Sequence, residues 1–169
     1  MSCWWPDAGT ITAIFTAVAA LAAFASVRAV KWQTRATLKV QSLLQLDDRW
    51  WSDGMRKTRK TAAKALLEKK YDPSVGRVLD FFETLAGLFV KGKVLSNEWA
   101  HHTFYWYAVG YWSKSRDPVK SLNLAPSEKR GWEDLDEMMP KWIDYEVKHG
   151  GARPTDDDID NFLQEELDL

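Results

Sequence analysis

The stretch Ala8–Val27, AGTITAIFTAVAALAAFASV, contains twenty residues and no charged side chain. As a helix it would be about 30 Å long, which matches the hydrocarbon core of a bilayer. Eight of the residues are alanine, so length favours a membrane span more strongly than hydropathy does. A long soluble helix normally carries charges on one face, and a signal peptide has its basic residues before the apolar run. The stretch therefore predicts a transmembrane helix, with a soluble helix and a signal peptide as alternatives.

The flanks of this run support the same interpretation. Tryptophans stand at both ends, where interfacial aromatic belts lie, and the basic residues follow the run. The predicted interface anchors are Trp4, Trp5, Arg28, Lys31, Trp32 and Arg35. Because positive flanks stay on the cytoplasmic side, we expect a single-pass membrane protein with its N-terminus outside and the rest of the chain in the cytoplasm. The small residues Ala13, Ala17, Ala20 and Ala23 fall near one face and would suit packing against another helix.

Charge is distributed unevenly along the 169 residues, although the net charge is only −1. Between Arg28 and Lys70 there are twelve basic and four acidic residues, a local net of +8, whereas Ser127–Leu169 carries a local net of −9 from five basic and fourteen acidic residues. This asymmetry suggests partners of opposite sign at the two ends. The one cysteine, Cys3, excludes an internal disulfide.

The remainder of the chain predicts helices throughout. Asp72 and Pro73 mark one helix start, and Thr155 marks another, because Asp and Thr cap helices and proline suits the first helical position. The predicted fold class is all-α: a transmembrane helix, a cytoplasmic bundle of about four helices, and a short acidic C-terminal helix. The predicted domains are a membrane anchor (1–31), the bundle (32–150) and the acidic amphipathic tail helix (151–169).

One segment resembles a known family. It is RVLDFFETLAGLFVKGKVLSNEWAHHTFYWYAVGYW, Arg77–Trp112. The matching residues are Leu79, Asp80, Phe82, Glu83, Leu88, Gly92 and Trp99. The segment is similar to an uncharacterised bacterial family, a domain of unknown function, of small single-pass membrane-anchored helical proteins. The resemblance covers about residues 32–112. It implies the architecture and a location in the bacterial inner (plasma) membrane, but no activity.

Two parts of the chain are candidate binding surfaces. The strongly basic second helix, predicted at about Met55–Lys70, could contact anionic lipid headgroups or form a solvated face. The predicted lipid contacts are Arg56, Lys57, Arg59 and Lys60. The aromatic fourth helix, predicted at about Asn97–Arg116, and the apolar stripe of the tail helix could bind a partner protein. The candidate residues are Trp99, Trp106 and Trp112 in the fourth helix and Ile159, Phe162 and Leu163 in the tail. Alternatively, the tail could dock on its own bundle, with the basic second helix as its partner.

Few residues suggest chemistry. The Glu-x-x-His spacing of di-iron bundles occurs twice, in Glu98 with His101 and in Glu146 with His149. With 24 acidic residues and three histidines in the chain, such Glu–His pairs commonly arise by chance. Glu83 lies between aromatic residues, so it is either a perturbed carboxylate or the ion-pair partner of a basic residue in the second helix. No phosphate-binding loop, dinucleotide fingerprint or zinc spacing is present. We therefore predict no catalytic residue, no metal site and no cofactor.

The leading functional hypothesis is a membrane-tethered, non-enzymatic interaction or scaffold module. Its expected partners are the lipid bilayer and either another protein or a second copy of the chain, and we expect no nucleic acid because no binding motif is present. One alternative is a membrane-perturbing effector of a bacterial defence or toxin system. A second alternative is a metal-dependent helical-bundle enzyme.

Overall fold

A computed structural model describes residues 8–91, 97–121 and 131–169. Every regular element in these ranges is helical, which confirms the all-α class. The chain divides into two compact units, Met1–Gln41 and Ser42–Leu169. The division falls within the first helix, α1 (Ala8–Trp51), whose last residues belong to the second unit.

The first unit consists, in its described part, of α1 up to Gln41. Among the described residues, no helix combines the length and the apolar character needed to cross a membrane, so the predicted transmembrane helix gains no support. Most side chains between residues 8 and 20 lie outside the part of the chain that the structure describes. Of the predicted interface anchors, Arg28, Lys31 and Trp32 are exposed on α1, whereas Trp4, Trp5 and the side chain of Arg35 lie outside the described residues.

The second unit begins with two helices whose ends are set by side-chain caps. Ser52 caps α2 (Asp53–Leu67) by accepting a hydrogen bond from the Met55 amide. Asp72 caps α3 (Pro73–Val90) by accepting from the Ser74 amide at 2.8 Å, and Pro73 takes the first helical position. Proline costs nothing there because the first amides of a helix have no intrahelical partner. The small residues on one face of α2 let it pack closely on α3.

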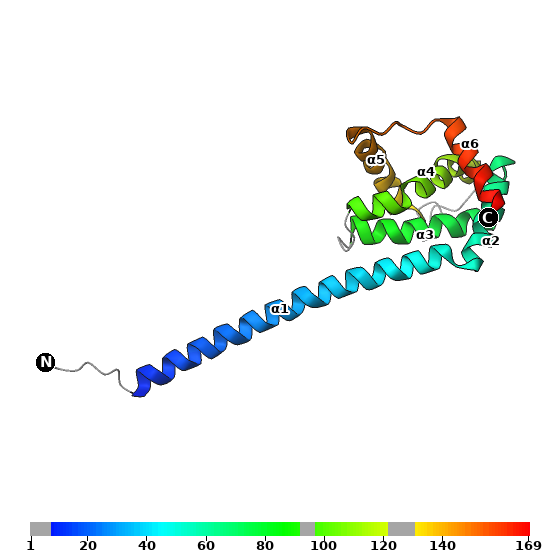
Figure 1. Cartoon of the computed structure of the whole chain (residues 1–169). Helices are drawn as coiled ribbons and strands as arrows, with labels where there is room; N and C mark the ends of the chain where they lie inside the picture. The colour runs from blue at the N-terminus through cyan, green and yellow to red at the C-terminus, as the bar shows by residue number, and fades with distance from the viewer. Residues whose placement is uncertain (1–7, 92–96, 122–130) are drawn as a thin grey trace. The chain divides into compact units, whose positions relative to one another are not determined.

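Three further helices and a final 3-10 turn complete this unit: α4 (Asn97–Ser121), α5 (Glu133–Lys148), α6 (Asp156–Glu165) and η1 (Glu166–Asp168). In Figure 1, α3 and α4 lie side by side, and α6 with η1 contacts α2 and α4. Thr155 and Asp158 form a reciprocal capping box at the start of α6. The acidic tail helix therefore packs on its own bundle, and the basic second helix is one of the elements it contacts.

The core of the second unit is built around Trp50, at the end of α1. Its ring centroid lies 4.8 Å from that of Phe81, 5.0 Å from that of Phe82 and 5.1 Å from that of Tyr107. Trp50 is completely buried, and tilted or edge-on aromatic contacts of this kind add to the free energy of burial. These contacts fix the end of α1 to α3 and α4. They thereby also position Trp51, the residue that follows Trp50.

Candidate functional site

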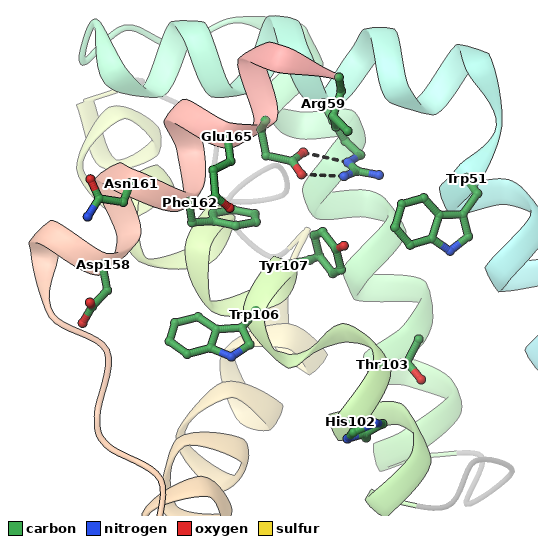
Figure 2. Close-up of a pocket in the computed structure, with 12 residues that line it drawn as sticks. Trp51, Arg59, His102, Thr103, Trp106, Tyr107, Asp158, Asn161, Phe162 and Glu165 are labelled. Atoms are coloured by element: carbon green, nitrogen blue, oxygen red, sulfur yellow. Dashed lines mark hydrogen bonds and ion pairs between the residues drawn. The ribbon is translucent and has the colours of Figure 1, made fainter.

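A groove of about 640 Å³ opens on the second unit between the end of α1, α4 and α6 (Figure 2). Four aromatic residues line it: Trp51, Trp106, Tyr107 and Phe162. Three acidic residues also line it: Asp158, Glu165 and Glu166. Its volume falls in the range of small-ligand pockets, and its mixture of rings with a few polar groups is typical of binding sites.

A buried polar cluster of Arg59, Tyr111 and Glu166 lies behind the aromatic wall. The Arg59 guanidinium donates from Nε to Glu166 Oε2 at 2.7 Å and from Nη2 to Oε1 at 2.5 Å, and both side chains are almost fully buried. The Tyr111 hydroxyl donates to Glu166 Oε2 at 2.7 Å and lies 3.1 Å from the Arg59 carbonyl oxygen. Such a bidentate pair fixes distance and orientation together. The Arg59–Glu166 pair connects η1 to α2, and the hydrogen bond from Tyr111 connects η1 to α4.

Arg59 also lies over aromatic rings. Its guanidinium carbon is 4.3 Å from the ring centroid of Trp50, 5.0 Å from that of Tyr107 and 5.3 Å from that of Trp51. Burial opposes its charge, but the hydrogen bonds and charge of Glu166 outweigh burial, so the pKa of Arg59 is raised above its ordinary value. Burial, followed by the charge of Glu166, raises the pKa of Tyr111. The cluster therefore holds an ionised pair and a neutral tyrosine.

Gly110 allows α6 to approach α4 closely enough to form the groove. A Cβ atom on Gly110 would lie 2.3 Å from Cδ1 of Phe162, well inside van der Waals contact. The Phe162 ring instead packs edge-on against Tyr107 and Tyr111, with centroids 5.8 and 5.7 Å apart. A glycine in the middle of α4 is costly for helix formation, and this contact accounts for it.

Only some of the residues predicted to bind a partner lie in the groove. Trp106 and Phe162 come together in the groove, and Trp106 is 50% exposed. Ile159 and Leu163 are buried in the core. Trp99 packs edge-on against Phe104, outside the groove lining.

Trp112 also lies away from the groove. Its indole Nε1 donates to Asp136 Oδ1 at 2.7 Å, and the Arg116 guanidinium lies over its ring. Trp112 therefore connects α4 to α5.

The predicted lipid contacts are also divided. Arg56, Lys57 and Lys60 are exposed on α2. The prediction for Arg59 is corrected: its side chain is buried and its charge is paired with Glu166, so it does not share that surface.

Glu83 has a different partner from the one predicted. Its carboxylate accepts hydrogen bonds from the amides of Asp134 at 3.1 Å and Leu135 at 2.8 Å, at the start of α5. The N-cap residue of α5, Trp132, makes no side-chain capping bond. Glu83 therefore caps α5 from α3 and does not pair with a basic residue of α2, since the unpaired amides and positive end of a helix attract a carboxylate. Burial raises the pKa of Glu83 despite these two bonds.

The histidines of the two Glu-x-x-His pairs occupy structural positions. His101 is buried, with Nε2 3.2 Å from the Trp142 carbonyl oxygen and 3.4 Å from Glu146 Oε2. Burial lowers the pKa of His101 below 6.5. His149 lies at the end of α5, with Nδ1 2.7 Å from the Tyr145 carbonyl oxygen. Within the described ranges, no three His, Cys, Asp or Glu side chains are grouped as metal ligands would be.

The sequence contains a signal for the buried cluster that motif reading misses. Arg59 follows Met55 by four residues and precedes Ala62 by three, so it stands within the buried stripe of α2. Glu166 follows Leu163 by three residues and extends the buried stripe of the tail in the same way. Because residues three and four apart share a helix face, two opposite charges on two apolar stripes indicate a buried ion pair.

Comparisons with protein-family models, with curated proteins and with solved structures found no match to the chain. The family resemblance therefore stays a prediction from the sequence.

Proposed function

We propose that the protein is a non-enzymatic interaction module that binds a segment of a partner protein in the groove and is held at a membrane by its N-terminal helix. The observation that carries the proposal is the exposure of Trp106, at 50%, and Trp51, at 38%, along the same hollow. Tryptophan and tyrosine dominate the energetic centres of protein interfaces. Large rings exposed together on a monomer mark such surfaces.

The rigidity of the groove wall supports binding. Tyr107 packs against Trp50 and Trp51, with centroids 5.1 and 5.9 Å away, and the buried cluster fixes the opposite side. A preformed wall loses little conformational entropy when a partner binds. Of the carboxylates that line the groove, that of Glu166 accepts hydrogen bonds from Arg59 and Tyr111 at both oxygens, which favours a structural role over proton transfer.

The membrane part of the proposal is supported by the sequence. The run Ala8–Val27 has the length of a span, and Arg28, Lys31 and Trp32 follow it on α1. These flanks orient the second unit toward the cytoplasm of a bacterial cell. Exposed cations on α2, among them Arg56, Lys57 and Lys60, would strengthen the attachment to anionic lipids.

Site-specific photo-crosslinking tests the partner site. A benzophenone amino acid at Trp106 in the full chain should capture one protein repeatedly, whereas the same group at Val147, which has similar exposure on α5, should not. Equal capture from both positions, or none from Trp106, would refute the groove as the binding surface.

Alkaline carbonate extraction tests the tether separately. The full chain should stay with the membrane pellet, and Ala17→Arg should release it by placing a charge inside the apolar run. Release of the unaltered chain by carbonate would refute the tether and leave the groove proposal standing.

A further inference from the structure

The inner part of the groove already shows how this set of side chains binds a guanidinium. Arg59 lies over Trp50, Tyr107 and Trp51 at 4.3 to 5.3 Å from the ring centroids. A carboxylate, that of Glu166, meets it edge-on with two hydrogen bonds. Aromatic faces attract cations, and a planar guanidinium can stack and pair at the same time.

The outer part of the groove repeats this combination without a cation of its own. Trp106, Tyr107 and Phe162 supply rings, and Asp158 and Glu165 supply carboxylates (Figure 2). In the part of the chain that the structure describes, neither Asp158 nor Glu165 forms an ion pair with a basic side chain.

Glu165 and Tyr107 line the same groove, and the charge of Glu165 acts on Tyr107. Burial raises the pKa of Tyr107, Arg59 opposes the shift, and the negative charges of Glu166 and Glu165 add to it. Because Arg59 and Glu166 largely cancel one another, Asp158 and Glu165 leave the lining of the groove negative.

We propose that the outer groove binds an arginine side chain of the partner protein, whose guanidinium stacks on Trp106 and pairs with Glu165. The inference rests on the proposed function and names the chemistry of the partner segment. Anionic partners such as nucleic acid are disfavoured by the two carboxylates. Arginine is favoured over lysine because its flat, weakly hydrated guanidinium matches an aromatic face, whereas an ammonium group stays strongly hydrated. The volume of about 640 Å³ leaves room for the residues flanking the arginine.

Isothermal titration calorimetry on the full chain in mild detergent tests this inference. The probe is a short acetylated and amidated peptide with one arginine between leucine and alanine residues, and the matched probe carries citrulline, which is neutral and nearly isosteric. The arginine peptide should bind about tenfold or more tightly than the citrulline peptide, since hydrogen bonds to charged groups contribute that much. Equal affinity for the two peptides would overturn the inference.

Variants locate the site. Glu165→Gln should lower the affinity for the arginine peptide to that for the citrulline peptide, and Trp106→Ala should weaken binding of both. Asp157→Asn, which removes another exposed charge from the same helix outside the groove lining, should leave the affinity unchanged. If Asp157→Asn weakens binding as much as Glu165→Gln does, the attraction is general and the specific site is refuted. Because Trp106 and Glu165 are exposed, circular dichroism should show both variants folded.

The two proposals fail differently. If photo-crosslinking from Trp106 captures a partner but the arginine and citrulline peptides bind equally, the groove is an interface and the arginine inference is wrong. If a third peptide, with lysine in place of the arginine, binds more tightly than the arginine peptide, the proposed stacking of a guanidinium is wrong. Absence of both crosslinking and peptide binding would refute both proposals.

Discussion

Replacing Glu166 with glutamine would leave the Arg59 guanidinium buried behind the groove with no negative partner. The wild-type pair is bidentate, and Tyr111 donates a third hydrogen bond to the same carboxylate. Removing one member of a buried ion pair costs about 3–5 kcal/mol, because the remaining charge stays desolvated. A domain of this size has a free energy of unfolding of about 5–15 kcal/mol. Glu166→Gln should therefore lower the melting temperature by roughly 10–20 °C.

Urea denaturation of the full chain, followed by far-UV circular dichroism, measures this cost. Glu165→Gln is the matched control: the same substitution at the preceding residue, which is exposed, should change stability by less than about 0.5 kcal/mol. The double variant Arg59→Met with Glu166→Leu should recover most of the loss, since apolar residues often replace a buried pair without penalty. A Glu166→Gln variant as stable as Glu165→Gln would refute the assignment of a buried, ionised pair.

Three further predictions concern the packing around Gly110, the cap of α5 and the pH dependence of stability. Gly110→Ala should destabilise the second unit by about 1–3 kcal/mol, because the Phe162 ring must move. The control Gly54→Ala, at a position with open space around it, should be neutral or stabilising. Equal urea midpoints for the two variants would contradict the close contact at Gly110. Glu83→Ala should cost about 1–2 kcal/mol through loss of the α5 cap, and amide hydrogen exchange should rise first at the start of α5. Because burial lowers the pKa of His101 in the folded state, the unfolded chain binds a proton at His101 more readily than the folded chain does. The free energy of unfolding should therefore fall as the pH drops from 6.5 toward the lowered pKa. The variant His101→Gln should remove this part of the pH dependence.

Local signals in the sequence were sufficient for the helices but not for their partners. Asp72 with Pro73, and Thr155, mark helix starts that the structure confirms, because capping acts over three residues of chain. Glu83 was singled out as a carboxylate among aromatic residues, yet its partners lie about fifty residues away at the start of α5. No periodicity within one helix can show which helix end faces such a carboxylate.

The groove was predictable only in part. Trp106 and Phe162 were singled out for their apolar character and helical position, and they do line one hollow. Phe162 lines the groove whereas its neighbour Leu163 is buried, and the position of Phe162 depends on a close contact with Gly110, about fifty residues away in the chain. Arg59 was grouped with the exposed cations because its helix is strongly basic, although its position in the apolar stripe of α2 argues for burial.

The role of the groove as an arginine-binding surface is tested most directly by the indole N–H resonances of the ten tryptophans in the isotope-labelled full chain. Titration with the arginine peptide should shift the resonances of Trp106 and Trp51, which line the groove, and leave those of Trp99 and Trp112 in place. The citrulline peptide should produce the same pattern only at much higher concentration. Shifts confined to Trp99 or Trp112, or an identical response to both peptides, would contradict the proposed site.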